Sequence, residues 1–326
     1  MNSQLDLQPG ADVDPDIRRF VAAMGAGFAA YPPLSSLSFP EQRRVCEQVR
    51  APFTRGGPQP ARVFEVTVPA AGREVRLRVY DPVFPRSVAS PGLVYLHGGG
   101  WTLFSLDTHD RLMREYAARA GVLVIGVDYA LSPESKFPVA LNEAVAAVWW
   151  LRAHAEDVGL DADRLAIGGD SAGANLAISA CLALRDAGER DAVKAMVLNY
   201  GVFDSDCDTA SHRRYGGEGY MLGSGEMAAF WSNYVRGQAD LAEPLARPLH
   251  ADLAALPPAL LVIAECDALH DEDQAMARAL AAAGVPTTAK VYAGATHSFL
   301  EAVSFAAVSG RALDDTAEWL RRTLND

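Results

Sequence analysis

The segment RLAIGGDSAGANLAISACLALRD, residues 164–186, places Ser171 midway between Gly169 and Gly173. The apolar residues before Ser171 predict a short buried strand, and Ala172–Leu184 has the spacing of a buried helix. A serine at such a turn takes a strained backbone conformation, which glycines two residues away on either side accommodate. The pattern G-x-S-x-G in this context predicts a serine that attacks a carbonyl carbon. The alternative is a tight turn with a helix cap.

A second motif, YLHGGGW, places three consecutive glycines after an apolar run. Glycines at a strand end cost conformational entropy, so packing alone explains them poorly. Without side chains, backbone N–H groups can approach a ligand closely. We expect two of Gly98, Gly99 and Gly100, together with Ala172, to donate hydrogen bonds to an oxyanion. The alternative is a flexible glycine loop. His97 is expected to hold this loop rather than to catalyse.

A nucleophilic serine needs a base, and the base needs an orienting carboxylate. The expected order along the chain is serine, then the acid, then histidine, with each residue at the C-terminal end of its own strand. Asp267 follows the apolar run PALLVIAEC, and His297 follows TTAKVYAGAT. We therefore predict Asp267 and His297 as the acid and the base, with Asp271 and Glu272 as acids of a helix N-terminus. The histidines considered and set aside are His109, His154, His250 and His270.

Composition narrows the class of partner. The chain has 326 residues, 50% of them hydrophobic and 21% charged, with a formal net charge of −12. This acidity argues against nucleic acid and anionic membranes, because phosphate binding depends on clustered Lys and Arg. A neutral or cationic small molecule fits better.

No metal or cofactor is expected, because neither HExxH nor a Cys/His ligand spacing occurs. The scattered Cys46, Cys181, Cys207 and Cys266 are expected to be reduced and mostly buried. The first residues contain acids and no basic segment before an apolar core, and no apolar run approaches the roughly 18–20 residues of a membrane span. A cytoplasmic protein without stable membrane insertion is the expectation.

Strand-like and helix-like segments alternate from about residue 73 onward, which predicts a mostly parallel sheet with helices on both faces. The expected strands are 74–82, 92–100, 121–129, 164–170, 194–201, 258–267 and 287–294, and the expected helices include 17–31, 138–159 and 271–284.

Two regions interrupt this alternation. Residues 1–60 contain the helix 17–31 and Pro-rich stretches, and residues 203–250 are too long for a plain loop. We expect residues 1–60 to form an arm that contributes to a cap, and residues 203–250 to form an inserted helical cap. The catalytic domain would comprise residues 61–202 and 251–326.

In these motifs the chain resembles the hormone-sensitive-lipase group of α/β-hydrolases, the bacterial family IV esterases, in the branch with a GDSAG elbow. The resemblance rests on HGGGW (97–101), DYALSPESKFP (128–138), GGDSAGANLA (168–177), DALHDE (267–272) and HSF (297–299), in the order of the family. It implies the α/β-hydrolase fold, with an eight-stranded sheet and a helical cap. It also implies hydrolysis of short- to medium-chain carboxylic esters.

Carried onto this sequence, the resemblance gives Ser171 as nucleophile, His297 as base and acid, Asp267 as its orienter, and Gly98 to Gly100 with Ala172 as oxyanion donors. The chain departs from the commonest family pattern at Ala130, Ala174, Ala268 and Ser298. None of these positions is in the triad, so they put substrate preference and loop packing in doubt rather than the chemistry.

The expected reaction is therefore acyl transfer from a small-molecule ester through an acyl-enzyme. Hydrolysis of lactones, amides or carbamates and transfer to another alcohol share the same triad, and a catalytically silent ligand receptor is a further alternative. A homodimer is left open. Seven aromatic residues could close an apolar pocket above Ser171: Phe28, Tyr31, Tyr215, Tyr220, Phe230, Trp231 and Tyr234.

Overall fold

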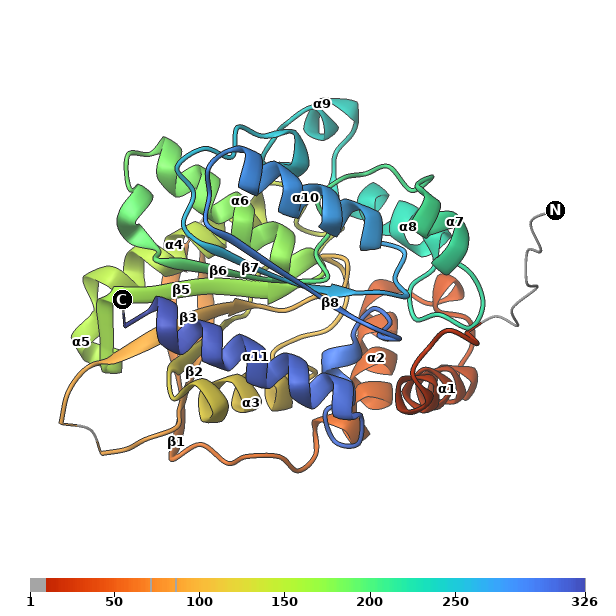
Figure 1. The fold of residues 1–326 in the computed structure, drawn as a ribbon, viewed down its shortest axis with the longest axis horizontal. Coiled ribbons are helices and arrows are strands. Elements are labelled where there is room, and N and C mark those ends of the chain that lie inside the picture. The colour runs from red at the N-terminus through yellow and green to blue at the C-terminus, as the bar shows by residue number, and fades with distance from the viewer. Residues whose placement is uncertain (1–9, 71, 86, 326) are drawn as a thin grey trace.

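A single mixed sheet forms the centre of the protein (Figure 1). The computed structural model describes residues 10–70, 72–85 and 87–325. The strands are β1 (Arg62–Ala70), β2 (Arg73–Asp81), β3 (Ser90–Leu96), β4 (Leu123–Val127), β5 (Leu160–Asp170), β6 (Ala195–Asn199), β7 (Ala259–Ala264) and β8 (Thr287–Tyr292). Their order is β1-β2-β4-β3-β5-β6-β7-β8, and only the pairs β1/β2 and β2/β4 are antiparallel. The predicted eight-stranded, mostly parallel sheet is confirmed.

Helices cover both faces of this sheet, as predicted (Figure 1). They are α1 (Pro15–Ala29), α2 (Phe39–Thr54), α3 (Asp110–Ala120), α4 (Val139–Ala153), α5 (Ala155–Val158), α6 (Ala172–Asp186), α7 (Ala210–Tyr215), α8 (Ser224–Tyr234), α9 (Gln238–Leu241), α10 (His270–Ala282) and α11 (Ala307–Thr323). In the described ranges, no helix has the length and apolar character that crossing a bilayer requires.

Side-chain alternation along the strands produces two cores. In β3, Leu93 and Tyr95 face a core shared with α3 and α11, whereas Val94 and Leu96 face a core shared with α4, α6 and α10. Because both faces are covered, the central strands β3 and β4 are buried along almost their whole length and are mainly apolar. The sheet is thus a rigid support whose strand ends carry the polar loops.

Several boundaries differ from the predicted ones. Strand β1 and helix α2 were not predicted, and the expected helix 138–159 is divided at His154 into α4 and α5. Helix α2 begins with a capping box, in which the side chain of Glu41 accepts from the backbone N–H of Ser38 at 3.0 Å. Strand β3 ends at Leu96, whereas the expected strand was 92–100. Gly98, Gly99 and Gly100 therefore lie in the loop after the strand.

The inserted segment, residues 203–250, contains α7, α8 and α9. The C-terminal end of α8 is fixed to the loop before α4. Lys136 Nζ donates to the carbonyl oxygens of Ser232, Asn233 and Val235 at 2.9, 2.6 and 2.9 Å. The ring of Tyr234 stacks on Trp101, with centroids 4.0 Å apart. Helix α8 is therefore held directly against the glycine loop.

The cysteines are free thiols, as predicted. Cys46, Cys181 and Cys266 are buried, and Cys207 is half-buried.

Candidate active site

Ser171 occupies a sharp turn between β5 and α6. Its backbone has φ 55° and ψ −121°, a conformation that costs a non-glycine residue about 1–3 kcal/mol. The flanking glycines make this turn sterically feasible, since an added Cβ at Gly169 or Gly173 would lie 2.3 or 1.9 Å from the carbonyl oxygen of Leu96. The strand-turn-helix context predicted from the sequence is therefore present.

Asp267 and His297 lie in the loops after β7 and β8, at the same end of the sheet as Ser171. Nδ1 of His297 is 2.7 Å from Oδ2 of Asp267, and Oδ1 of Asp267 accepts from the N–H of Leu269 at 3.1 Å. The side chain of Asp267 is fully buried and that of His297 is 7% exposed. The structure thus brings together the predicted acid and base, and His297 lines the same cavity as Ser171.

Of the four histidines set aside, His109 contacts Asp170 behind the elbow, and the other three have partners away from Ser171. His154 contacts the carbonyl of Trp150, His250 contacts Asp204, and His270 contacts the carbonyl of Ala264. Asp271 and Glu272 lie in the first turn of α10, as predicted.

The glycine loop after β3 presents two free N–H groups to the cavity. The N–H of Gly98 instead donates to Oδ1 of Asp170 at 3.1 Å. Within the described residues, the N–H groups of Gly99 and Gly100 have no partner, and both glycines line the cavity. Ala172 begins α6, so its N–H also lacks a partner within the helix. This arrangement leaves Gly99, Gly100 and Ala172 available to an oxyanion.

His97 supports this loop and does not line the cavity. Its Nδ1 lies 2.7 Å from the carbonyl oxygen of Gly98, and the hydroxyl of Tyr129 donates to the carbonyl of His97 at 2.7 Å. Burial lowers the pKa of His97 to about 3, and the neighbouring charge of His109 contributes. A neutral, structural His97 agrees with the expectation from the sequence.

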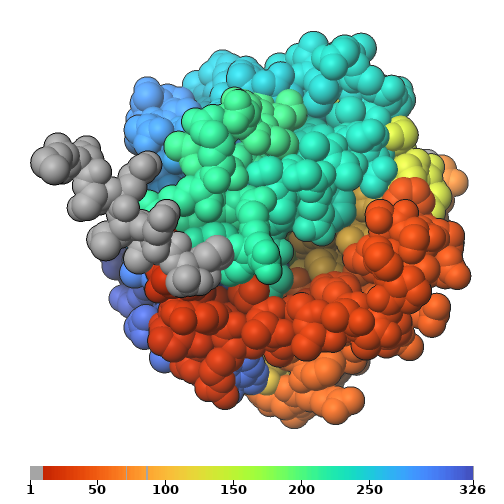
Figure 2. Space-filling view, turned by 90° about the vertical axis from the view of Figure 1, so that its right-hand side faces the viewer, coloured from red at the N-terminus to blue at the C-terminus, as the bar shows by residue number. Residues whose placement is uncertain are grey.

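The cavity above Ser171 has a volume of about 420 Å³. Figure 2 shows the surface hollowed between the N-terminal helices, in red and orange, and the inserted segment, in green and cyan. Of the seven aromatic residues proposed for this pocket, Phe28, Tyr220 and Phe230 line it. Tyr31, Tyr215, Trp231 and Tyr234 do not, because they pack against other parts of the two cores.

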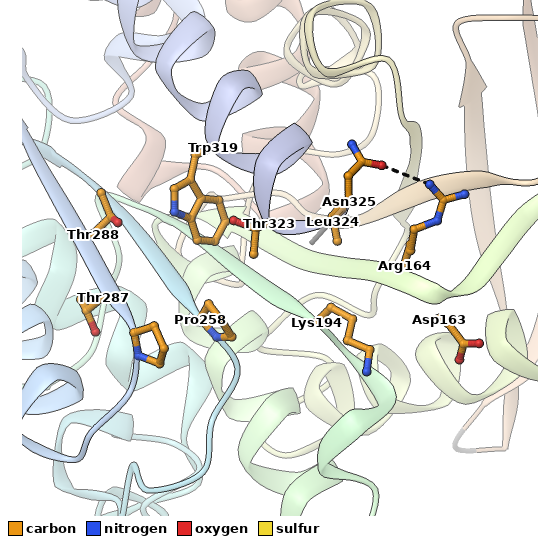
Figure 3. Close-up of a pocket in the computed structure, with 11 residues that line it drawn as sticks. Asp163, Arg164, Lys194, Pro258, Thr287, Thr288, Trp319, Thr323, Leu324 and Asn325 are labelled. Carbon is orange, nitrogen blue, oxygen red and sulfur yellow. Dashed lines mark hydrogen bonds between the residues drawn. The ribbon is translucent and has the colours of Figure 1, made fainter.

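A larger groove of about 950 Å³ lies at the opposite end of the sheet (Figure 3). Its lining includes Lys194, Pro258 and Thr287, which are at the N-terminal ends of β6, β7 and β8. Ligands of parallel α/β sheets bind outside the carboxyl ends of the strands. The groove contains neither Ser171 nor His297, so the smaller cavity is the candidate active site.

Sequence analysis missed the buried partners of the elbow. Asp170 accepts hydrogen bonds from Gly98 and from the hydroxyl of Tyr95 at 2.9 Å, and it lies 3.3 Å from His109. Only the position of Asp170 beside Ser171 could have suggested a role. Its partners are up to 75 residues away in the chain, and no local pattern pairs them.

A family model described as the alpha/beta hydrolase fold matches residues 93–301. The chain belongs to the α/β-hydrolase family. It is 36% identical to an ethyl acetate hydrolase of Pseudomonas putida, over 96% of this chain and 99% of that protein. It is 35% identical to a carboxylic ester hydrolase of Mycobacterium tuberculosis, over 87% and 75% of the two chains.

Among solved structures of the α/β-hydrolase family, an esterase from Pyrobaculum calidifontis superimposes with a TM-score of 0.88 and 32% identity. The match covers 95% of this chain and 98% of that one. These similarities, with the GDSAG elbow, confirm membership of the hormone-sensitive-lipase group. The enzyme class is carboxylic ester hydrolase.

Proposed function

We propose that this α/β-hydrolase cleaves short- to medium-chain acyl esters with Ser171, His297 and Asp267 as its triad. The observation that carries the proposal is the 2.7 Å contact between His297 and Asp267 at the edge of the cavity that also contains Ser171. The carboxylate of Asp267 is buried, and among the described residues its partners are His297 and the N–H of Leu269. It can therefore hold the proton of His297 on Nδ1 and leave Nε2 free to accept one.

In the first step, Nε2 of His297 takes the Ser171 proton while Oγ attacks the ester carbonyl carbon. The resulting oxyanion accepts hydrogen bonds from the N–H groups of Gly99, Gly100 and Ala172. The imidazolium then gives its proton to the leaving alcohol, and an acyl-enzyme remains. Water, deprotonated by the same Nε2, attacks the acyl carbon. The imidazolium then returns this proton to Oγ of Ser171 as the bond to the acyl carbon breaks and the acid leaves. We assign no oxyanion role to Gly98, because its N–H is already bonded to Asp170.

The preference for short chains follows from the size and walls of the cavity. Its volume of about 420 Å³ is at the lower end of ligand pockets, which span about 300–1,000 Å³. Helices α1 and α2 contribute Phe28 and Cys46, and the inserted segment contributes Tyr220 and Phe230. We propose that residues 1–60 and 203–250 together form a cap on the catalytic domain, residues 61–202 and 251–326. The relative named for ethyl acetate hydrolysis is consistent with a small acyl group.

The test is a hydrolysis screen with esters of acids from two to sixteen carbons, a lactone and an anilide, comparing wild type with Ser171→Ala. We expect hydrolysis of the esters of two to eight carbons, with the rate falling by at least a thousandfold in Ser171→Ala. Ser179→Ala is the matched control, because Ser179 lies in α6 and its buried hydroxyl has no hydrogen-bond partner among the described residues. It should keep the wild-type rate.

A chelator should leave the wild-type rate unchanged. A Ser171→Ala variant that retains most of the ester hydrolysis would refute the triad. If the lactone or the anilide were hydrolysed faster than the esters, the proposed triad would stand and the proposed substrate class would be wrong.

A further inference from the structure

A glutamate in the wall of the cavity has no cationic partner. Glu226 belongs to the first turn of α8 and lines the cavity together with Ser171 and His297. Phe230, four residues later on the same face of the helix, also lines the cavity, and its ring lies against Gly100. The side chain of Glu226 is exposed. Because this face of α8 covers the glycine loop, the exposed surface of Glu226 is part of the cavity surface.

The surroundings of Glu226 strengthen its effect on a charge in the cavity. Burial raises the pKa of Glu226, whereas the backbone N–H of Gly223 and the charge of His297 lower it. Burial raises the pKa of Cys46, which lines the same cavity from α2, to about 12, and the charge of Glu226 contributes. Solvent screens a carboxylate enclosed in this way less than a carboxylate on an open surface.

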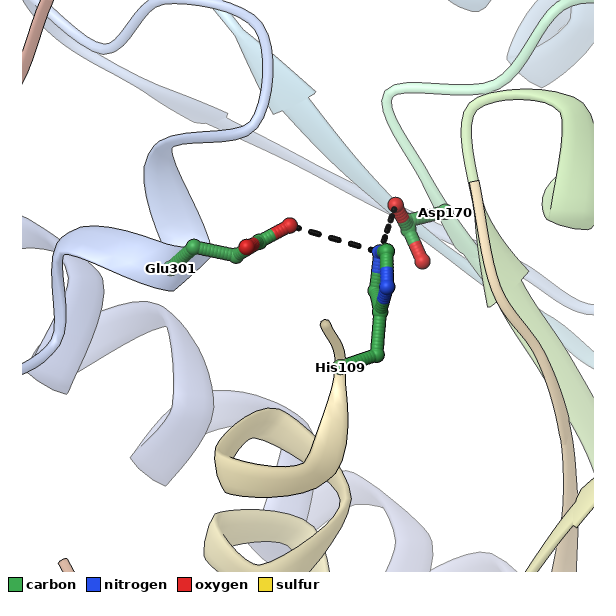
Figure 4. A group of neighbouring side chains, drawn as sticks. All are labelled: His109, Asp170 and Glu301. Carbon is green, nitrogen blue, oxygen red and sulfur yellow. Dashed lines mark hydrogen bonds and ion pairs between the residues drawn. The ribbon is translucent and has the colours of Figure 1, made fainter. Parts of the chain in front are cut away.

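The other charged groups behind the cavity are already paired. Among the described residues, Arg50 supplies the one guanidinium or ammonium group of the cavity wall, and it forms an ion pair with Glu301. Asp170 also lines the cavity, and its Oδ2 lies 3.3 Å from Nε2 of His109. The same nitrogen is 3.3 Å from Oε1 of Glu301 (Figure 4). These side chains satisfy one another, so Arg50 is not available to neutralise Glu226.

A second carboxylate and several aromatic rings lie in the same wall. Glu218 lines the cavity and has an exposed side chain. Phe28, Tyr220 and Phe230 line it as well. The face of an aromatic ring attracts a cation, and rings combined with a carboxylate are a common way to bind an ammonium group. An anionic substrate would instead be repelled by the carboxylates. The net charge of −12 acts in the same direction.

We propose that Glu226 determines specificity by charge, so that the cavity selects esters that carry an ammonium group over neutral esters of the same shape and rejects esters that carry a carboxylate. This inference rests on the ester hydrolysis proposed above and narrows its substrate class. The ammonium group can belong to the acyl part or to the alcohol part of the ester, and the substrates of the experiment distinguish these two cases.

The experiment compares esters that differ in charge but hardly in shape. Acetylcholine is paired with 3,3-dimethylbutyl acetate, in which carbon replaces the quaternary nitrogen of the alcohol part. The ethyl ester of β-alanine is paired with ethyl butanoate, which changes the charge of the acyl part. At about pH 7.5, kcat/KM of the wild type should favour the cationic member of at least one pair by at least about tenfold. Monoethyl succinate, with an anionic acyl part, should have a kcat/KM at least about tenfold below that of ethyl butanoate.

Glu226→Gln removes the charge, keeps the shape of the side chain and can still accept from the N–H of Gly223. It should lower the cationic-to-neutral ratio of kcat/KM by at least about fivefold. An effect of Glu226 on His297 would be common to both members of a pair and would cancel in this ratio. Hydrolysis of the neutral member also shows that the variant is folded. Glu243→Gln, at an exposed glutamate of the inserted segment outside the cavity wall, is the matched control and should leave the ratio unchanged.

The possible outcomes separate this inference from the proposed function. Equal kcat/KM for the cationic and neutral members of both pairs in the wild type would overturn the inference while ester hydrolysis stands. A preference for the cationic member that Glu226→Gln leaves unchanged, or that Glu218→Gln alone abolishes, would show that Glu226 does not determine it. Absence of hydrolysis of every ester would refute the proposed function itself.

Discussion

Replacing Asp267 by Asn tests the orientation of the base with almost no change of shape. Oδ1 of Asp267 accepts from the N–H of Leu269 at 3.1 Å, and Oδ2 accepts from Nδ1 of His297 at 2.7 Å. In the Asn side chain, the oxygen should keep the bond to Leu269 and the NH₂ group should face His297. Nδ1 would then have to accept, so the hydrogen of the neutral ring would move to Nε2. This tautomer cannot accept the proton of Ser171.

The expected loss is about 10⁴-fold in kcat, the order found when this hydrogen bond is changed in serine proteases. At 1.36 kcal/mol for each factor of ten, this corresponds to about 5 kcal/mol of transition-state stabilisation. A loss of this magnitude is reasonable because Asp267 is fully buried, so solvent does not screen the interaction of its carboxylate with His297. Binding should change little, since Asp267 does not line the cavity.

The assay is the steady-state hydrolysis of p-nitrophenyl acetate and butyrate, with thermal unfolding to confirm that the variant is folded. Asp271→Asn is the control, because Asp271 accepts from the N–H of Ser211 at 2.8 Å and has no contact with His297 among the described residues. It should lose less than about threefold. If Asp267→Asn kept a tenth or more of the wild-type kcat while Asp271→Asn lost activity, Asp267 would not be the acid.

Three further predictions concern the cavity, the thiols and a buried carboxyl group. Phe230→Ala should move the preferred acyl chain to longer esters in the same screen, because the Phe230 ring lies against Gly100 in the cavity wall; an unchanged chain profile would contradict this. Burial raises the pKa of Cys46 to about 12, so iodoacetamide at pH 8 should neither modify Cys46 nor reduce activity, as peptide mass mapping would show. Burial raises the pKa of Asp273 well above its usual range, so stability should fall as pH rises from about 4 toward that higher pKa. Asp273→Asn can still accept from the N–H of Gly201. It should therefore raise Tm at pH 8 and change Tm little at pH 4. An equal change in Tm at both pH values would mean that ionisation of Asp273 is not the cause.

The meeting of the three proposed triad residues at one end of the sheet could be predicted because each of them is marked by its own neighbours. Ser171 has glycines on both sides, and Asp267 and His297 each follow an apolar strand. Strand ends of a parallel sheet converge at one edge, so local patterns were sufficient to place these side chains together.

Other features depend on contacts that a local pattern does not contain. Strand β1 is an edge strand whose pairing with β2 buries only part of its residues, so its apolar signal is weak. Helix α2 is rich in charged residues, and its buried Arg50 pairs with Glu301, which is 251 residues later in the chain. The sequence also could not show which glycine N–H groups are free, because this depends on the contact of Gly98 with Asp170.

The attachment of α8 has a consequence for how substrate reaches Ser171. Lys136 bonds three carbonyl groups at the end of this helix, and Tyr234 stacks on Trp101 beside the glycine loop. A lid that swung open on α8 would leave the ammonium of Lys136 without these acceptors and would pull on the loop of Gly99 and Gly100, the proposed oxyanion donors. These contacts hold α8 in place over Ser171, so we expect esters to enter through the hollow between the N-terminal helices and residues 218–222 (Figure 2). We therefore expect simple saturation kinetics on dissolved monomeric esters, without activation at an oil–water interface.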